Sequence, residues 1–187
     1  MRFCLITTFF PPYHFGGDGV FVAHLANALA RDGHHVQVIH DLDSFRLMQG
    51  TVQTSSIQIE PSVQVHTLHS GFGPLSPLLT YLTGQPGLKQ KKIAEILDQG
   101  FDVIHWHNIS LVGGPGALQL GSAVKLCTLH EYWLFCPTHI LFKNNEQACT
   151  SRSCLRCQIA HHRPPQLWRY TSLMERSRRE IDRFLAP

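Results

Sequence analysis

The first forty residues contain a strand pattern, a glycine-containing loop, a helical pattern and a second strand pattern, in that order. The apolar run at residues 3–10 has the length of a strand and ends at prolines, as expected of a strand buried in a parallel sheet. Apolar residues then recur with helical spacing over residues 20–29, with Asp18 as the expected cap and Gly33 as the expected end. A β-branched strand follows at 36–39. Two strands joined through a helix are expected to be parallel, with a right-handed crossover.

The same alternation continues along the chain. Further strands are expected at 63–69, 101–108 and 124–129, and helices at 88–97, 117–120 and 166–183. Residues 41–62 give no firm signal, residues 71–87 indicate a long loop or a broken helix, and 184–186 resemble the opening of one more strand. The pattern predicts an α/β fold with a doubly wound, mostly parallel sheet, forming a single domain over residues 1–187.

Composition excludes several classes of protein. The 187 residues are 43% hydrophobic and 16% charged, with a formal net charge of +3, and the Lys and Arg residues are scattered. A nucleic-acid-binding stripe is therefore not expected. No apolar run approaches the roughly 18 residues of a membrane span. The amino terminus lacks a cleavage site and runs into Pro11-Pro12, which favours a buried strand over a secretory signal and predicts a cytoplasmic location.

The loop at residues 15–19 contains three glycines. A glycine-rich turn between a strand and a helix lets backbone N–H groups approach a phosphate, although the glycines could serve only for tight turning. A dinucleotide-binding fingerprint, with Gly17 and Gly19 upstream of Asp41, is a weaker alternative. That fingerprint needs a glycine directly after the strand and a small residue where Val22 stands.

Polar residues follow three of the expected strands. They are Tyr13-His14, the stretch 105–108 and His130-Glu131. In an open α/β sheet the carboxyl ends of parallel strands form the ligand-binding edge, and a histidine there can orient or protonate a hydroxyl near neutral pH. Because the chain has thirteen histidines, a purely structural role is the alternative for each of them, and more so for His105 than for His130.

The six cysteines fall into two sets. Cys4 and Cys127 lie in apolar strands and are expected to be small buried hydrophobes. The other four lie in a polar excursion over residues 136–162, and they are Cys136, Cys149, Cys154 and Cys157. In a reducing compartment a structural zinc site is favoured over disulfides, while unliganded thiols and an iron–sulfur cluster stay open. His161 and His162 are reserve ligands.

The carboxyl-terminal stretch 166–187 carries five arginines beside Trp168 and Phe184. It could lie on an anionic membrane, so a peripheral contact at the inner face of the membrane is one expectation. Acidic residues dilute its charge, however, which favours the solvated face of a packed helix. The apolar stretch 78–82 is a weaker candidate for contact with a lipid or an acceptor.

Several motifs, taken in order, resemble the amino-terminal domain of family 4 glycosyltransferases of the GT-B fold. They are Phe10-Pro11-Pro12 with Gly16-Gly17, Leu25-Ala26-x-x-Leu29 with Gly33-His34-x-Val36, the run 101–108, His130-Glu131-Tyr132-Trp133-x-x-Cys136-Pro137, and the ending 182–187. The resemblance spans essentially the whole chain. It implies the acceptor-side, Rossmann-like lobe of an enzyme that moves a sugar from a nucleoside diphosphate donor to an acceptor hydroxyl with retention, and without a catalytic metal.

The same resemblance assigns roles by position. Gly16 and Gly17 would approach the diphosphate or sugar of the donor, and His130 would be the catalytic residue that hydrogen-bonds the transferred sugar or the acceptor. His107 and Asn108 would border the acceptor pocket. Glu131 stands where the family usually has Asp, so its position is expected to differ in detail. The acceptor would be a sugar or a lipid-linked molecule.

The donor-binding carboxy-terminal lobe of such enzymes is not contained in these 187 residues. Since catalysis of this kind depends on positioning and charge stabilisation across a cleft, the chain alone is expected to show no appreciable turnover. A non-catalytic carbohydrate- or protein-binding module on the same half-fold is the main alternative. A nucleotide-sugar epimerase of related shape is a weaker one.

Overall fold

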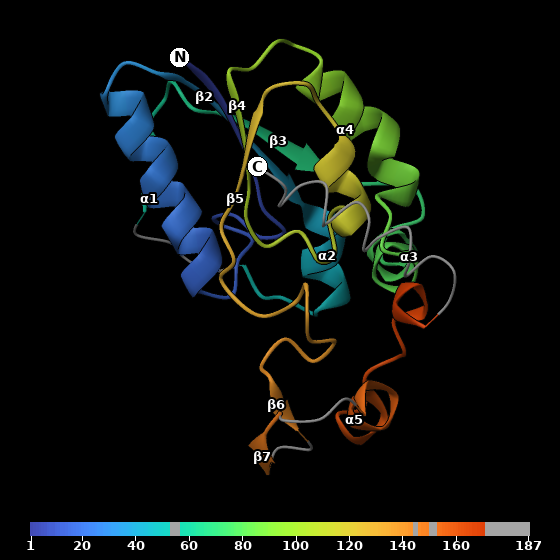
Figure 1. Cartoon of the computed structure of the whole chain (residues 1–187). Coiled ribbons are helices and arrows are strands. Elements are labelled where there is room, and N and C mark those ends of the chain that lie inside the picture. The colour runs from blue at the N-terminus through green and yellow to red at the C-terminus, as the bar shows by residue number, and fades with distance from the viewer. Residues whose placement is uncertain (53–56, 144–145, 150–152, 171–187) are drawn as a thin grey trace.

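The computed structural model describes residues 1–52, 57–143, 146–149 and 153–170. A five-stranded sheet lies at its centre, with all strands parallel and in the order β3-β2-β1-β4-β5 (Figure 1). The strands are β1 (Arg2–Ile6), β2 (His35–Asp41), β3 (Gln64–Leu68), β4 (Val103–Trp106) and β5 (Val124–Cys127). The expected α/β, Rossmann-like architecture is confirmed, and five of the expected strands lie in this sheet.

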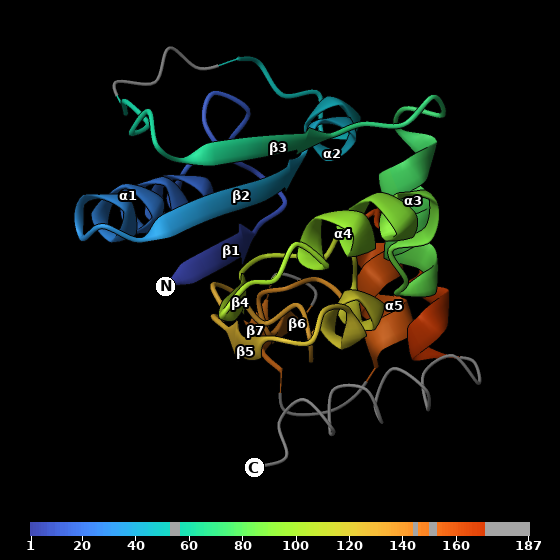
Figure 2. The same cartoon turned by 90° about the horizontal axis from the view of Figure 1, so that it is seen from above.

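Helices cover both faces of the sheet (Figure 2). Alternate residues of a strand point to opposite faces, so Leu5 packs with α1 (Gly17–Arg31), whereas Cys4 and Ile6 face the other way. On that second face, α4 (Gln90–Leu97) and the 3₁₀ helix η2 (Pro115–Gln119) complete the core. Burial on both faces explains the continuous apolar character of the first strand.

The start of α1 differs from the expectation. The helix begins at Gly17 rather than near residue 20, and no side chain caps it, so the role predicted for Asp18 as the cap is wrong. Gly16 precedes the helix at φ 130°, a conformation that side-chain-bearing residues rarely adopt. Asp18 instead lies in the first turn, where a carboxylate is favoured by the helix dipole. Gly33 follows the helix at φ 80°, as expected.

The region between β2 and α4 is more ordered than its sequence indicates. A helix α2 (Leu42–Leu47) occupies part of the stretch that gave no firm signal. Residues 71–87, expected as a loop or a broken helix, contain the regular helix α3 (Leu75–Thr83), and the 3₁₀ helix η1 (Gly87–Lys89) follows. Gly84 ends α3 in the left-handed conformation. The strands expected at 3–10, 101–108 and 124–129 are shorter in the structure, at 2–6, 103–106 and 124–127, because their last residues leave the sheet.

An ion cluster is buried where this region meets the end of β2. Nζ of Lys89 lies 2.5 Å from Oδ1 of Asp41 and 3.2 Å from Oδ2 of Asp43, and all three side chains are at most 3% exposed. Asp41 also accepts a hydrogen bond from the Ser44 hydroxyl, and Asp43 from the backbone N–H of Ser70. The cluster therefore joins β2, α2, η1 and the segment that follows β3.

The segment after β5 extends away from the sheet (Figure 1). It contains a small hairpin of β6 (Phe142–Lys143) and β7 (Gln147–Ala148), the helix α5 (Cys154–Ala160) and the 3₁₀ helix η3 (Leu167–Arg169). The guanidinium of Arg169 donates hydrogen bonds to the carbonyls of Trp133 and Leu134, which connects the end of the segment to its beginning.

Two expectations for the carboxyl-terminal stretch cannot be compared with the structure. Most of the helix expected at 166–183, and all of the strand opening at 184–186, lie outside the described residues. Among the helices that are described, none is both long enough and apolar enough to span a membrane.

Candidate functional site

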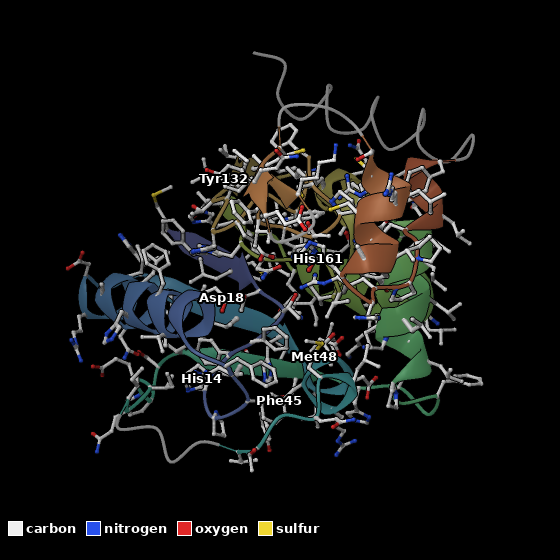
Figure 3. The ribbon with its side chains drawn as sticks, turned by 90° about the horizontal axis from the view of Figure 1, so that it is seen from below. His14, Asp18, Phe45, Met48, Tyr132 and His161 are labelled. Atoms are coloured by element: carbon white, nitrogen blue, oxygen red, sulfur yellow. The ribbon has the colours of Figure 1, made fainter. Side chains whose placement is uncertain are left out.

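A cavity of about 300 Å³ opens at the carboxyl-terminal edge of the sheet. It is lined by residues from the segments that follow β1, β4 and β5, namely Phe9, Phe15, Gly17, Asp18, Asn108, His130 and Glu131. Figure 3 views the molecule from this side, with Asp18 between the flanking side chains of His14 and Tyr132. Parallel strands bring their carboxyl ends to one edge, so the topology itself gathers these segments.

Two histidines form a pair at the centre of this edge. Nδ1 of His107 lies 3.0 Å from Nε2 of His130, and the His107 ring is fully buried while His130 is exposed. The His105 ring also packs against His107, with ring centroids 4.1 Å apart. Phe21 of α1 meets the His130 ring edge-on, with centroids 5.2 Å apart. The imidazole of His130 is thus held at the cavity from beneath and from one side.

Burial, followed by the effect of charge on the neighbouring His105 and His130 rings, lowers the pKa of His107 to about 3. His107 is therefore neutral at pH 7 and carries one N–H. Its Nε2 has no hydrogen-bond partner in the described structure, and buried unpaired N–H groups are rarer than buried unpaired acceptors. The tautomer with the proton on Nδ1 is favoured, and it donates to His130. Neutral His130 then carries its own proton on Nδ1.

Asp18 and Asn108 contact each other in the lining of the cavity. Nδ2 of Asn108 donates to Oδ2 of Asp18 at 3.1 Å, and the backbone N–H of Gly19 donates to Oδ1 at 2.8 Å. The carbonyl of Asn108 accepts from both the N–H and the hydroxyl of Thr8 at 2.7 Å. These bonds fix the end of β4 against the loop after β1 and place a carboxylate at the amino end of α1.

The glycines of this loop have different reasons for being glycine. A Cβ added at Gly19 would lie 2.9 Å from Cβ of His14 and 3.1 Å from the Phe9 carbonyl, so the close approach of α1 to the loop excludes a side chain there. A Cβ on Gly17 would meet nothing within 4 Å, and Gly17 does not have a positive φ. The structure therefore needs a glycine at position 19, while position 17 borders open space at the cavity.

Glu131 lines the cavity, and one of its carboxylate oxygens is hydrogen-bonded to another side chain. Nδ1 of His139 lies 2.8 Å from Oε1 of Glu131, and the Glu131 side chain is 30% exposed. This contact connects the rim of the cavity to the segment that carries the cysteine cluster.

Four of the six donor- and acceptor-site residues expected from the sequence line the cavity: Gly17, Asn108, His130 and Glu131. His107 lies beneath His130, and Gly16 is next to the lining but donates its N–H to Nδ1 of His14 at 3.2 Å. Sequence reasoning missed Asp18, which it took for a helix cap, and the aromatic residues Phe9 and Phe15. An acidic residue directly after two loop glycines was the available signal for Asp18.

The dinucleotide-binding alternative does not fit the structure. It requires the acidic residue after the second strand to reach a ribose, yet Asp41 is fully buried. Both of its carboxylate oxygens are bonded within the protein, to Lys89 and to Ser44.

Because the side chains of His40 and His107 are buried, we expect the protein to lose stability in acid. Burial lowers the pKa of His40 to about 4 and that of His107 to about 3, from 6.5 in the unfolded chain. Between these values the unfolded state binds more protons, so stability is full above pH 6.5 and falls as the pH decreases toward 3–4. From pH 7 to 5 we expect a loss on the order of 1–2 kcal/mol per histidine.

Urea unfolding at several pH values tests this expectation. His40→Gln should flatten the decrease below pH 6.5, whereas replacing the exposed His24 with Gln should leave it unchanged. An unaltered slope in His40→Gln would contradict the assignment to buried histidines.

The four clustered cysteines line a second, much smaller cavity of about 20 Å³. The six cysteines all lie in the described residues, and no disulfide joins them. As the described side chains are placed, no three or more His, Cys, Asp or Glu form a ready-made metal-binding group. Cys4 is fully buried, as expected, and Cys127 is partly buried at the side of the main core.

Comparison with protein-family models matches residues 15–187 to Glycosyltransferase Family 4. The chain belongs to glycosyltransferase family 4. The match covers nearly the whole chain, including every residue of the cavity except Phe9. No curated protein matches the sequence. For this family 4 domain, membership supports a function of the glycosyltransferase type.

Proposed function

We propose that this domain forms the acceptor side of a retaining glycosyltransferase that moves a sugar from a nucleoside diphosphate-sugar to an acceptor hydroxyl. The observation that carries the proposal is the single cavity shared by Gly17, Asn108 and His130 at the carboxyl-terminal edge of the sheet. Family membership supports the reaction class, and the residues of the cavity suggest which side chains bind the substrates and assist the transfer.

His130 is the proposed catalytic residue. With His107 donating to its Nε2, His130 offers an N–H at Nδ1 and so acts as a hydrogen-bond donor to a sugar or acceptor oxygen. A hydrogen-bond donor that is already in position before the reaction stabilises the negative charge that develops on an oxygen during sugar transfer. His107 is a positioning residue, because it acts on the substrate only through His130.

The carboxylate of Asp18 favours some ligand groups in its part of the cavity and disfavours others. It repels phosphate oxygens but accepts hydrogen bonds from hydroxyls, and the Asn108 amide fixes its orientation. We therefore place sugar or acceptor hydroxyls at Asp18 and Asn108. Any diphosphate contact is assigned to the side of the loop at Gly17, where no side chain intervenes. The apolar faces of Phe9 and Phe15 border the remaining space.

Gly17→Ala is expected to weaken ligand binding while leaving the fold intact. An added methyl group meets no atom of the domain within 4 Å and projects into space at the cavity, and alanine favours a helix start over glycine. We expect an unchanged or slightly higher midpoint of thermal unfolding, and a weaker affinity for the donor measured by calorimetry.

Gly19→Ala is the matched control. Its Cβ would clash with His14 and the Phe9 carbonyl, so it should lower stability by about 1–3 kcal/mol. If Gly17→Ala bound ligand as the wild type does, the placement of substrate next to Gly17 would be wrong.

The proposed activity is tested by titrating a panel of nucleoside diphosphate-sugars into ¹⁵N-labelled protein and following backbone amides. Shifts centred on Gly17, Asn108 and the His130 segment support the proposal, and transfer of a labelled sugar by the full-length protein establishes it. A full-length protein that binds sugars at this edge but transfers none would favour the non-catalytic binding module. Retention is read from the anomeric configuration of the product.

A further inference from the structure

We propose that Cys136, Cys149, Cys154 and Cys157 bind one zinc ion as a tetrathiolate site. The four residues come from three separate parts of the segment after β5: Cys136 precedes the hairpin, Cys149 follows β7, and the other two lie on α5. All four nevertheless line the same small cavity. A shared metal ion gives a physical reason for this convergence in a segment with few apolar contacts of its own.

The size of the cavity suits a single ion. Zinc–sulfur bonds of about 2.3 Å in a tetrahedron place the sulfurs roughly 3.8 Å apart, which is close to their contact distance when no metal is bound. Ligation therefore requires the four thiols to turn toward one shared space of atomic size. The observed cavity of about 20 Å³ is of that order, since one water-sized sphere occupies roughly 10–15 Å³. Rotation of the thiols toward its centre would complete the ligand set that the present side-chain placement lacks.

The turn around Cys136 is built to support a thiolate. Its Sγ lies 3.3 Å from the Thr138 hydroxyl, which can donate a hydrogen bond to it, and the Cys136 carbonyl accepts from the backbone N–H of His139 at 3.0 Å. A donor directed at the sulfur stabilises a negative charge there.

Arg169 provides a second, independent observation. Its side chain is partly buried and, within the described structure, its guanidinium hydrogen-bonds only to neutral acceptors: the Gln166 amide and the Trp133 and Leu134 carbonyls. It also lies close enough to Cys136 and Cys154 to interact with charge on either sulfur. Zinc with four thiolates carries a net charge of −2, which would supply a counter-charge that none of the described hydrogen-bond partners of Arg169 provides.

The site would have a structural consequence for the cavity at the sheet edge. Cys136 is only three residues from His139, whose ring holds the Glu131 carboxylate at the rim. A metal that fixes Cys136 to α5 would also fix this rim, while α5 connects through η3 back to Trp133 and Leu134.

Metal content of the full-length protein tests the proposal. Protein purified without chelators should contain about one zinc per chain by plasma mass spectrometry. Cys149→Ser and Cys154→Ser should each lose most of it. Cys127→Ser, which alters a cysteine on β5 away from the cluster, should retain it. Less than roughly a tenth of an equivalent in the wild type would overturn the proposal, as would iron with sulfide or a disulfide among the four cysteines.

A second measurement needs no variant that could fail to fold. Apoprotein titrated with cobalt(II) chloride alone should develop the visible d–d absorption and thiolate charge-transfer bands of a tetrahedral sulfur site, and one equivalent of zinc should abolish them. Weak absorption typical of octahedral cobalt(II) would contradict ligation by four thiolates. Neither measurement involves a sugar, so a negative result would leave the proposal for glycosyl transfer untouched.

Discussion

Lys89→Met is expected to destabilise the protein by about 3–5 kcal/mol, a large part of the total stability of a typical domain. The substitution preserves most of the side-chain volume but removes the cation bonded to Asp41 and Asp43, which are both fully buried. The two carboxylates would then be left without a counter-charge in the interior. The measurement is the free energy of unfolding in urea at pH 7.

Lys92→Met is the matched control, because its side chain is 64% exposed and pairs with Glu95 only at 3.7 Å. Exposed pairs of this kind contribute about 0–1 kcal/mol. Adding Asp41→Asn to Lys89→Met should recover part of the lost stability, since it removes one of the uncompensated charges. A cost for Lys89→Met below about 1 kcal/mol would show that the cluster does not stabilise the fold as its burial indicates.

His130→Ala in the full-length protein is expected to reduce kcat by about 10²–10³-fold. The substitution removes the hydrogen-bond donor that we assign to the reacting oxygens, while the contacts of Asp18, Asn108 and Gly17 remain. We therefore expect a smaller change in the donor KM than in kcat. Initial rates with a labelled nucleoside diphosphate-sugar provide the measurement.

Two further variants separate chemistry from folding. His35→Ala removes an exposed histidine at the start of β2, at the opposite edge of the sheet, and should leave the rate unchanged. His107→Phe keeps a ring beneath His130 but removes the bond to its Nε2, so kcat should fall and its pH profile should shift. Full activity in His130→Ala would contradict the catalytic role. An activity loss matched by loss of folding, monitored by circular dichroism, would assign His130 a structural role instead.

Much of the core architecture was predictable because it depends on local periodicity. The apolar run at the amino terminus, the helical spacing before Gly33 and the later strand patterns led directly to a parallel sheet covered by helices. The sequence contains no signal for short elements that are stabilised by residues far away in the chain, such as α2. Helix α2 begins at Leu42 and is capped by Asp41, whose side chain is held by Lys89. No pattern indicates that this lysine is buried.

The site was predictable in outline for a topological reason. Parallel strands end at the same edge, so polar residues after separate strands were expected to meet, and Gly17, Asn108 and His130 do. Asp18 was misassigned because the same acidic residue suits a helix cap or a first turn. Only the actual start of the helix distinguishes the two.

By itself, the sequence determined the five strands of the sheet, the helix that follows the first of them, the parallel arrangement, and the edge of the sheet at which polar residues gather. Tertiary structure alone decided which side chains touch there: the bond between His107 and His130, the Asp18–Asn108 contact, and the four cysteines around one cavity. The physical reason is the separation along the chain between the residues that interact. Periodicity and capping act within a few turns of chain, whereas these contacts bring together residues as far as 23 and 90 positions apart. Distances and burial between such residues exist only in the folded molecule.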